Sequence, residues 1–253
     1  MQLRKLYEGY PHDNEYIKSY IEYQQRYAKD ARESDKKLIE LAGRLLAEYA
    51  PAGRPARLLD IGCSTGNLLI HLKRAFPTLD IAGGDLSELS IANCKENPAL
   101  EGVTLEVMDI RRLDERPNHY DIVTANAILY GFTDELFKSS LKAVNETLVP
   151  GGWLIAFDFF HPFDQDVELV EKTTHFLEGH PLHFRSYAST RRALGAAGFG
   201  EPRFAPFEIQ VDLPDRGPSS VSTRTVMAKD GRRLQYRGCL SQPWCHMAVR
   251  KPA

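Results

Sequence analysis

The sequence contains no apolar run that approaches the roughly 18 residues needed to cross a bilayer. Its opening stretch, MQLRKLYEGYPHDNEY, also lacks the apolar core of a secretory signal peptide. Cysteine is scarce: the four cysteines form neither a CxxC pair nor the dense framework of a disulfide-rich secreted domain. We therefore expect a cytoplasmic protein without a membrane partner, whose cysteines are reduced thiols packed as small apolar side chains.

Long runs of basic residues are absent as well. The chain carries 32 Lys and Arg residues against 34 Asp and Glu residues, for a net charge of −2. This balance offers no electrostatic support for a nucleic-acid partner. The hydrophobic fraction of 43% is ordinary for a globular protein that can build a full core, and the sequence contains no repeat or low-complexity tract. Its 253 residues are consistent with one large domain.

Between residues 57 and 160, patterns of buried strands alternate with patterns of amphipathic helices. We expect strands at 57–61, 79–84, 103–108, 120–126 and 153–160, and helices at 67–75, 87–96 and 134–148. Thr133 is the expected N-cap of the last helix, and Pro150-Gly151-Gly152 is expected to turn into the last strand. Strands joined by helices imply crossover connections and a mostly parallel sheet covered on both faces.

The two flanking parts of the chain have different patterns. Before the alternation, a polar, tyrosine-rich stretch is followed by a helix that is predicted to begin near Ser34. After it, residues 161–183 are polar and histidine-rich without a clear period, and a helix is predicted over 187–197. Short strands are expected at 203–212, 222–228, 232–238 and 244–250. Asp230-Gly231 between the middle two is a strong hairpin signal, so we expect antiparallel strands to complete the sheet.

The loop after the first strand has the pattern D-x-G-x-S-x-G over residues 60–66. Gly62 and Gly66 lie at the carboxyl end of that strand, where open parallel sheets bind ligands, and a residue without a Cβ allows a sharp turn and a close approach. The loop is not a P-loop, because Asn67 follows Gly66 where a lysine is needed, and it does not match the dinucleotide fingerprint G-x-G-x-x-G. Asp60 would repel a phosphate and attract a cationic ligand.

Two further aspartates follow the second and third strands. Asp85 lies 19 residues after Gly66, and a carboxylate in this place can accept both ribose hydroxyls of a nucleoside. Asp109 is placed to accept the amino group of adenine, with Leu86 or Ile110 beside the ring. Carboxylates at three successive strand ends therefore predict a nucleoside ligand that also carries positive charge.

With these motifs in this order, the chain resembles the class I S-adenosylmethionine-dependent methyltransferases. The resemblance rests on LLDIGCSTGNL, GGDLSELSIANCKEN, LEVMDIRRL, YDIVTANAILYGF and LVPGGWLIAF, which span about residues 58–158. It implies S-adenosylmethionine as cofactor and S-adenosylhomocysteine as product. It also implies an α/β fold with a Rossmann-like, doubly wound, mostly parallel seven-stranded sheet, antiparallel C-terminal strands, an N-terminal helical lid and an extra C-terminal β-hairpin. Residues 1–253 would form a single domain, with the lid in 1–50, the cofactor-binding core in 51–160 and the substrate-side segment in 161–253.

The resemblance further implies roles for particular residues. The methionine part of the cofactor would be surrounded by Asp60, Gly62, Cys63, Ser64, Thr65 and Gly66. The ribose, the adenine and the sulfonium would be bordered by Asp85, by Asp109 with Leu86 and Ile110, and by the backbone of Asn126. Ser64 departs from the glycine that many members have there. QQRYAKDARESDK (24–36) resembles an N-terminal helix of such enzymes, so Tyr27 and Arg32 are candidates for contacting the cofactor carboxylate, a solvated helix face being the alternative.

Methyl transfer requires that an acceptor atom is aligned with the methyl–sulfur bond, and it needs no covalent residue. A general base is required only if the acceptor must lose a proton. The candidates lie just past the fourth and fifth strands: Tyr130, Asp158 and His161, of which His161 titrates nearest to neutral pH. A packed core histidine is the alternative for His161. No metal site is expected, because His175, His180 and His183 lack the spacing of a closed zinc site.

The acceptor is expected to be a small molecule, with the methylated atom (O, N or C) undetermined. Tyr10, Tyr16, Tyr20 and Tyr23 are expected to cover it as a lid, opposite the C-terminal hairpin. Arg224, Arg232, Arg233 and Arg237 either bind a carboxylate or phosphate of the acceptor or solvate an exposed hairpin, and Trp244 is expected in the core. The alternatives are an enzyme acting on tRNA or protein, and a protein that binds the cofactor without transferring methyl groups. A homodimer is left open.

Overall fold

The computed structural model describes residues 17–18, 21–22, 24, 27–48, 51, 53–172, 177, 179–217 and 221–253. The four tyrosines of the expected lid, Tyr10, Tyr16, Tyr20 and Tyr23, lie outside the described residues, as does His175. Within the described part of the chain, no helix is both long and apolar enough to cross a membrane.

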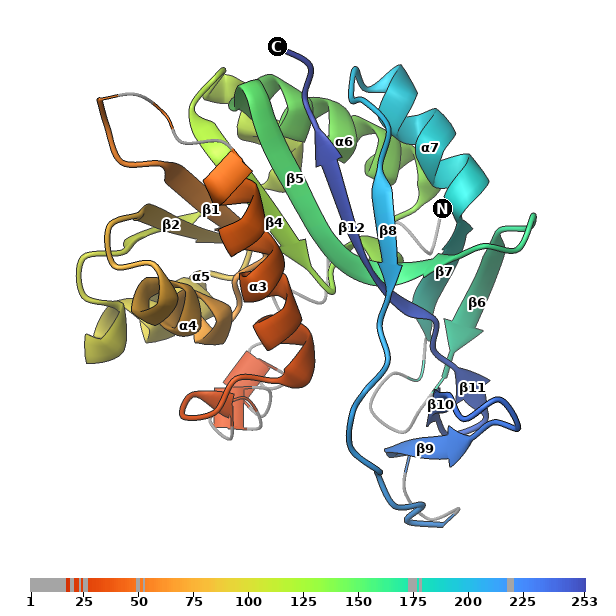
Figure 1. Cartoon of the computed structure of the whole chain (residues 1–253). Coiled ribbons are helices and arrows are strands. Elements are labelled where there is room, and N and C mark those ends of the chain that lie inside the picture. The colour runs from red at the N-terminus through yellow and green to blue at the C-terminus, as the bar shows by residue number, and fades with distance from the viewer. Residues whose placement is uncertain are drawn as a thin grey trace.

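A twisted sheet forms the centre of the molecule (Figure 1). Its main path follows the order β3 (Thr104–Val107), β2 (Asp80–Asp85), β1 (Arg57–Ile61), β4 (Tyr120–Asn126), β5 (Leu148–His161), β12 (Trp244–Arg250) and β8 (Arg203–Pro206). The first five of these strands are parallel, and β12 runs antiparallel to both β5 and β8. The predicted seven-stranded, mostly parallel sheet with an antiparallel C-terminal strand is confirmed.

Helices cover both faces of this sheet (Figure 1). One face packs against α3 (Glu33–Glu48), α4 (Asn67–Ala75) and α5 (Glu88–Glu96), and the other against α6 (Asp134–Thr147) and α7 (Tyr187–Ala196). Successive residues of the central strands point to opposite faces, so Leu58 belongs to one apolar cluster and Leu59 to the other. Because both faces are covered, the central strands are nearly continuous apolar runs, as the sequence indicated.

The N-termini of the helices follow local capping chemistry. Thr133 accepts a hydrogen bond from the amide of Leu136 and caps α6, as predicted. Ser87 and Ser186 cap α5 and α7 in the same way. Ser34 is not a cap, because α3 already begins at Glu33.

The structure differs from the predicted strands in three places. Pro150-Gly151-Gly152 is not a separate turn: it lies inside β5, which begins at Leu148, and the pairing of β4 with β5 shifts there. Only Arg203–Pro206 of the expected strand 203–212 is a strand. The segment without a period contains β6 (Val167–Glu171) and β7 (His180–Ser186), which pair antiparallel, and β7 extends the far end of β5. β6 is largely exposed, so it shows no apolar alternation in the sequence.

The C-terminal hairpin is confirmed. β9 (Thr223–Met227) pairs with β10 (Arg233–Arg237), and β11 (Leu240–Ser241) completes a small antiparallel sheet of three strands. Gly231 in the turn has a φ of 83°, a conformation that glycine adopts without strain. This small sheet lies beyond the carboxyl end of β5 and beside β6 and β7 (Figure 1). Short 3-10 helices complete the description: η3 (Pro98–Leu100), η4 (Ile110–Glu115) and η5 (Leu129–Gly131).

Candidate functional site

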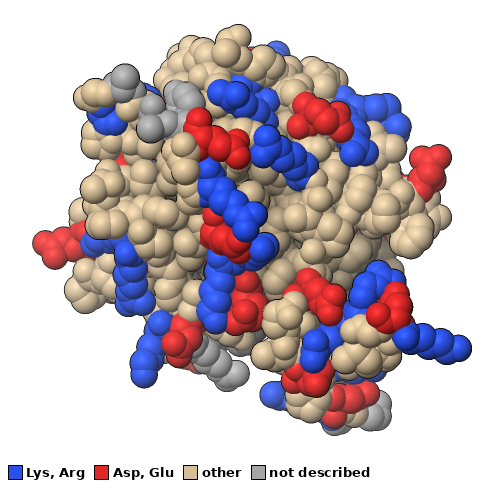
Figure 2. Space-filling model, in the orientation of Figure 1, with Lys and Arg blue, Asp and Glu red and all other residues tan. Residues whose placement is uncertain are grey.

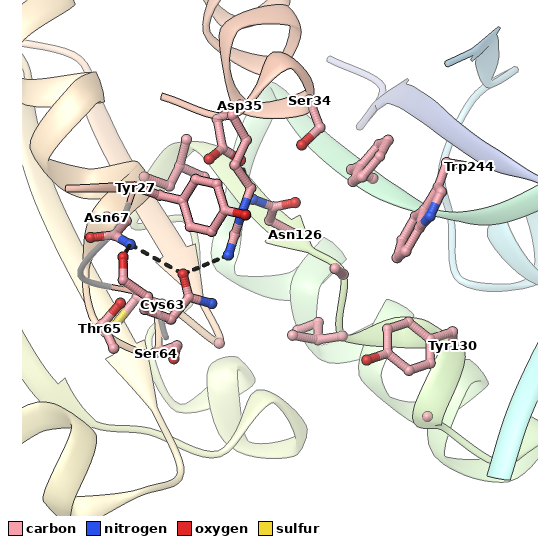
Figure 3. A pocket seen from close by; sticks show the side chains of 18 of the residues that line it. Tyr27, Ser34, Asp35, Cys63, Ser64, Thr65, Asn67, Asn126, Tyr130 and Trp244 are labelled. Carbon is pink, nitrogen blue, oxygen red and sulfur yellow. Dashed lines mark hydrogen bonds between the residues drawn. The ribbon is translucent and has the colours of Figure 1, made fainter. Parts of the chain in front are cut away.

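A cavity of about 940 Å³ opens at the carboxyl ends of β1, β2, β3 and β4 (Figure 3). We call one part of it the carboxylate half, which is lined by Asp35, Asp60, the 62–65 loop, Asp85, Asp109 and Asn126. The other part, the aromatic half, is lined by Tyr130, Phe157, Phe159, Glu171, His180, Phe207, Arg237 and Trp244. The two halves are continuous, so a ligand in one half can touch a ligand in the other.

The loop after β1 has the backbone that its glycines suggested, with positive φ at Gly62 (77°), Ser64 (49°) and Gly66 (74°). The amides of Gly62 and Cys63 both donate to the carbonyl of Gly84 on β2. A Cβ on Gly62 would lie 2.6 Å from Ile128, and one on Gly66 would lie 2.5 Å from Leu100. These glycines are therefore required by chain direction and close packing as well as by any approach of a ligand.

Asp85 ties this loop to the end of β2. One carboxylate oxygen accepts the amide of Ser64 and the other accepts the amide of Ser87, each at 2.8 Å. Burial raises the pKa of Asp85, and the hydrogen bonds from these two amides oppose that rise. Each oxygen retains lone-pair capacity, so the carboxylate can still accept from a ligand in the cavity.

Asp60 at the end of β1 is 2% exposed and accepts a hydrogen bond of 2.7 Å from the hydroxyl of Thr124 on β4. The pKa of Asp60 is raised to about 7, mainly by burial and also by the nearby carboxylates of Asp35 and Asp85, while the hydrogen bond from Thr124 opposes the rise. A carboxyl group with such a pKa exchanges its proton near neutral pH, and a cation beside it favours the ionised form.

Asp35 is a lining residue that the sequence interpretation missed. It is 2% exposed, accepts a hydrogen bond of 3.0 Å from the side chain of Asn126, and has a pKa raised by burial. A signal was present, because Asp35 shares one face of α3 with the buried residues Leu38, Ala42 and Leu45. A carboxylate on the apolar stripe of a helix requires a partner, and here it faces the cavity.

Tyr27 and Arg32 both line the cavity, as expected for cofactor contacts. The guanidinium of Arg32 lies 4.2 Å from the ring centre of Tyr27 and donates to the side chain of Gln24 at 2.6 Å. The side chain of Asn67 donates to the backbone carbonyl of Gln24 at 2.7 Å (Figure 3). This network fixes the segment before α3 to the first turn of α4, and sequence reasoning did not identify Gln24 or Asn67 as parts of it.

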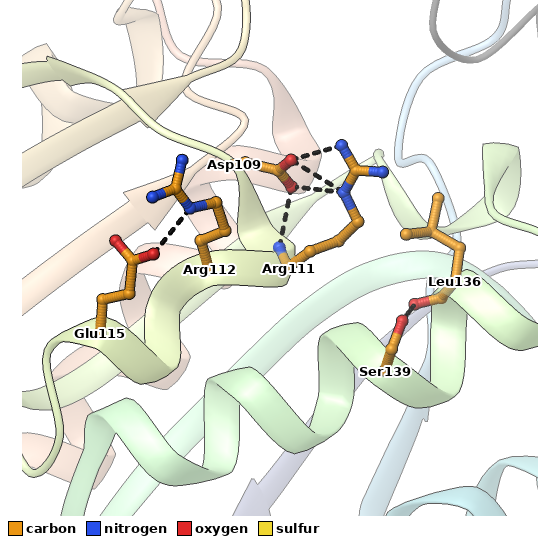
Figure 4. Close-up of polar contacts among 6 residues, drawn as sticks. All are labelled: Asp109, Arg111, Arg112, Glu115, Leu136 and Ser139. Carbon is orange, nitrogen blue, oxygen red and sulfur yellow. Dashed lines mark hydrogen bonds and ion pairs between the residues drawn. The ribbon is translucent and has the colours of Figure 1, made fainter.

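Asp109 lines the cavity beside Leu86 and Ile110, but its carboxylate is already engaged. The Nε of Arg111 donates to both carboxylate oxygens, at 2.9 and 2.8 Å, and the Arg111 amide donates to one of them (Figure 4). Burial raises the pKa of Asp109, but the contacts with Arg111 outweigh it and leave the pKa below its ordinary value. An adenine amino group can approach Asp109 only at the remaining lone pairs or after the exposed Arg111 side chain rotates away.

Tyr130 is the one expected acid–base candidate that lines the cavity, among the described residues. It lies in η5, whose backbone is held by the buried side chains of Asp158 and Arg185. Asp158 accepts the amide of Leu129 at 2.7 Å, and Arg185 on β7 donates to the carbonyl oxygens of Leu129 and Phe132 at 3.0 and 2.5 Å. Asp158 and Arg185 therefore hold the turn that presents Tyr130.

The other two base candidates are placed away from the cavity. His161 is 5% exposed, lies at the end of β5 beside Phe163 and is not a lining residue, so the expectation that it acts as a base is not supported by its position. Asp158 is buried beneath η5, where burial raises its pKa to about 7 and Arg185 opposes that rise. Its hydrogen bonds hold the turn of η5 in place.

Of the other residues singled out in the sequence, some line the cavity and some do not. His180 and His183 belong to the strand β7 and not to a solvated loop, and only His180 lines the cavity. Trp244 is a half-buried cavity wall, not a core residue (Figure 3). Of the four hairpin arginines only Arg237 reaches the cavity. Among the described residues no cluster of three or more metal-binding side chains exists.

Charges of both signs are mixed on one face of the molecule (Figure 2). On the face shown in Figure 2, basic and acidic side chains alternate, and the described residues of that face form no continuous basic stripe. Many are paired locally, as in the contacts of Arg112 with Glu115 and of Arg191 with Glu201. This face, like the net charge, gives no electrostatic support for a nucleic-acid partner.

Comparisons with known proteins agree with the fold. Residues 58–152 match a family model described as a methyltransferase domain. The chain is 27% identical over 166 residues to the ubiquinone/menaquinone biosynthesis C-methyltransferase of Desulfotalea psychrophila, a match covering 65% of this chain and 66% of that protein. It is 32% identical over 129 residues to the trans-aconitate 2-methyltransferase of Methylobacterium nodulans, covering 51% and 46%. The matched segment thus spans between about half and two thirds of these relatives.

A solved structure has the same fold. The S-adenosylmethionine-dependent methyltransferase of Methanosarcina mazei superposes with a TM-score of 0.57 at 14% identity, covering 82% of this chain and 97% of that one. The carbon methyltransferase of CurJ superposes with a TM-score of 0.55, covering 87% and 54%. The chain therefore matches a methyltransferase domain over residues 58–152 and has the fold of the class I S-adenosylmethionine-dependent methyltransferases.

Proposed function

We propose that this protein transfers a methyl group from S-adenosylmethionine to a small-molecule acceptor. The observation that carries the proposal is the continuity of the cavity: a carboxylate half at the strand ends opens directly into an aromatic half built by η5, the far end of β5 and the C-terminal third. The named relatives support the size class, since their printed activities concern a quinone precursor and trans-aconitate. The methylated atom is left undetermined.

The carboxylate half fits the cofactor by charge. Asp35, Asp60 and Asp85 are held close to one another, and burial raises the pKa of each. Carboxylates in this condition favour a ligand that brings positive charge, and the cofactor has an ammonium group and a sulfonium. We assign the ribose hydroxyls to Asp85, the ammonium to Asp60 and the cofactor carboxylate to Arg32. The adenine is assigned to the space between Leu86 and Ile110.

The cofactor supplies an activated methyl group, and the protein positions the acceptor next to it. Proximity and orientation can contribute about 7–11 kcal/mol in favourable cases. Tyr130 and Trp244, whose ring centres are 6.1 Å apart, lie in the aromatic half and restrict where an acceptor can sit. The phenol of Tyr130 can donate a hydrogen bond to the acceptor and orient it. Apolar walls also exclude water from the reacting atoms.

The activity is tested by incubating the protein with isotopically labelled S-adenosylmethionine and fractionated metabolite pools. We expect one compound to gain about 14 mass units, the mass of a methyl replacing a hydrogen, plus the mass of the isotope label, and S-adenosylhomocysteine to accumulate in equal amount. Binding of S-adenosylhomocysteine without transfer to any small molecule would contradict the proposal and favour a binding protein. Transfer only to RNA or protein, with affinity that falls steeply with salt, would also contradict it.

Cofactor affinity should depend on pH through Asp60. Its carboxyl group, with a pKa of about 7, must lose its proton to bind the ammonium. The affinity for S-adenosylhomocysteine should therefore rise about tenfold per pH unit below pH 7 and level off above it. Calorimetric titrations between pH 5.5 and 8.5 measure this slope. In Asp60→Asn the slope should disappear; an unchanged slope in that variant would rule out Asp60 as the titrating group.

A further inference from the structure

The aromatic half has walls suited to a flat ring. Trp244 stacks on Phe157 with ring centres 4.7 Å apart and an interplanar angle of 11°. Trp244 also lies 4.3 Å from Phe159, which in turn lies 5.2 Å from Tyr130. Four aromatic rings from η5, β5 and β12 thus form one continuous wall of the cavity. Aromatic walls gain most from a planar partner, because offset-stacked and edge-to-face contacts add to simple apolar burial.

Polar side chains next to this wall are electrically balanced, and the ring of one of them, His180, lies 5.9 Å from the ring of Tyr130. Arg237 on β10 forms an ion pair with Glu171 on β6, and both side chains line the cavity. His180 lies opposite Glu171 in the ladder of β6 and β7 and also lines the cavity. The Arg237 and Glu171 side chains are only 33% and 15% exposed, so the pair is partly shielded from water.

This balance determines which acceptor charge is tolerated. The positive charge of Arg237, which could attract an anionic acceptor, is already neutralised by Glu171. The negative charge of Glu171, which could attract a cationic acceptor, is already neutralised by Arg237. Taking an uncompensated charge out of water into such a half is unfavourable. A neutral hydroxyl or carbonyl group, in contrast, can exchange hydrogen bonds with Arg237, Glu171 or His180 without separating the pair.

We propose that the acceptor is a flat, uncharged aromatic molecule that carries a hydroxyl or carbonyl group, with its ring against Trp244 and Tyr130 and its polar group toward the Glu171–Arg237 pair. The inference rests on the proposed function, since it describes the acceptor of that same site. The aromatic half gives the shape selection, and the ion pair gives the charge selection.

Three matched probes separate shape from charge. 2-Naphthol is flat and neutral at pH 7, 2-naphthoate is flat and anionic, and decahydro-2-naphthol is neutral but not flat. We expect calorimetric titrations in the presence of saturating S-adenosylhomocysteine to give at least tenfold tighter binding of 2-naphthol than of either other probe. Equal or tighter binding of 2-naphthoate or decahydro-2-naphthol, or no binding of 2-naphthol, would overturn the proposal.

Two variants test the assigned residues. Trp244→Leu should weaken 2-naphthol binding at least tenfold, whereas Phe163→Leu, an aromatic side chain 68% exposed and outside the cavity lining, should leave it unchanged. Glu171→Gln releases Arg237 from its partner and should improve 2-naphthoate binding at least tenfold relative to 2-naphthol. No change in this ratio would overturn the charge selection.

The same titrations distinguish the two proposals. Binding of S-adenosylhomocysteine is measured first for each protein, because it depends on the carboxylate half alone. If S-adenosylhomocysteine does not bind to the unaltered protein, the proposed function fails. If it binds and 2-naphthol does not, the acceptor inference fails while the cofactor assignment stands.

Discussion

Replacement of Arg185 by methionine is expected to lower the free energy of unfolding by about 3–5 kcal/mol. Arg185 is 4% exposed, donates to the carbonyl oxygens of Leu129 and Phe132, and lies 4.2 Å from the ring centre of Phe137. Its removal leaves two buried carbonyl groups without these donors and leaves the buried Asp158 without a nearby cation. The size of the loss follows from breaking one side of a buried charged network.

Chemical denaturation monitored by circular dichroism measures this loss. Arg191→Met is the matched control, since Arg191 pairs with Glu201 on the surface and its replacement should cost less than about 1 kcal/mol. The double variant Arg185→Met/Asp158→Asn should recover part of the loss. A loss for Arg185→Met no larger than that of the control would contradict the assigned role.

The deficit of Arg185→Met should also grow with pH. Because the pKa of Asp158 in the folded protein is raised to about 7, folding favours its neutral form, a contribution present in acid and lost as the pH rises through about 7. Without Arg185 the carboxylate becomes still less favourable, so the variant should lose more stability at pH 8 than at pH 6. A pH-independent deficit would show that the lost hydrogen bonds, and not the charge of Asp158, dominate.

Replacement of Asp85 by alanine is expected to weaken binding of S-adenosylhomocysteine by about a hundredfold or more. Hydrogen bonds to charged groups contribute about 1.5–3 kcal/mol each, and two ribose hydroxyls would lose their acceptor. The sequence alone suggests little effect on folding. The structure changes that expectation, because Asp85 also accepts the amides of Ser64 and Ser87. We expect an additional loss of stability of about 1–3 kcal/mol.

Titration calorimetry and thermal denaturation of Asp85→Ala separate the two effects. The matched control is Asp80→Ala, an exposed aspartate at the other end of the same strand β2, which should change neither quantity. Unchanged cofactor affinity in Asp85→Ala would count against the placement of the ribose. A loss of affinity equal in both variants would indicate a general disturbance of β2.

Local patterns predicted the central part of the molecule well. The alternation of strands and helices from Arg57 to Thr147 was readable because the central strands β1 and β4 are buried on both faces and the helices pack an apolar face on the sheet. The cap of α6 at Thr133 and the turn at Asp230-Gly231 depend on neighbouring residues only. The loop of Asp60, Gly62 and Gly66 could be predicted for the same reason, because its pattern also lies within a few neighbouring residues.

The residue pattern did not show which side chains are already paired, buried or exposed in the folded protein. Asp109 looked available in the sequence, but Arg111 turns back to its carboxylate. His161 followed the fifth strand, as a base would, but the sheet continues through it and buries its side chain. β6 escaped notice because an exposed strand without alternating apolar residues depends on its pairing with β7 for its stability.

The sequence by itself determined the fold class, the cofactor family and the carboxylate half except for Asp35, because these depend on short motifs at the ends of strands whose order follows from chain connectivity. Only the tertiary structure decided the aromatic half. Its walls come from η5, the far end of β5, the β6–β7 pair, β10 and β12, which no local pattern places together. Side chains so far apart in the chain meet only when the sheet has formed, and which of them face the same cavity depends on strand register and direction.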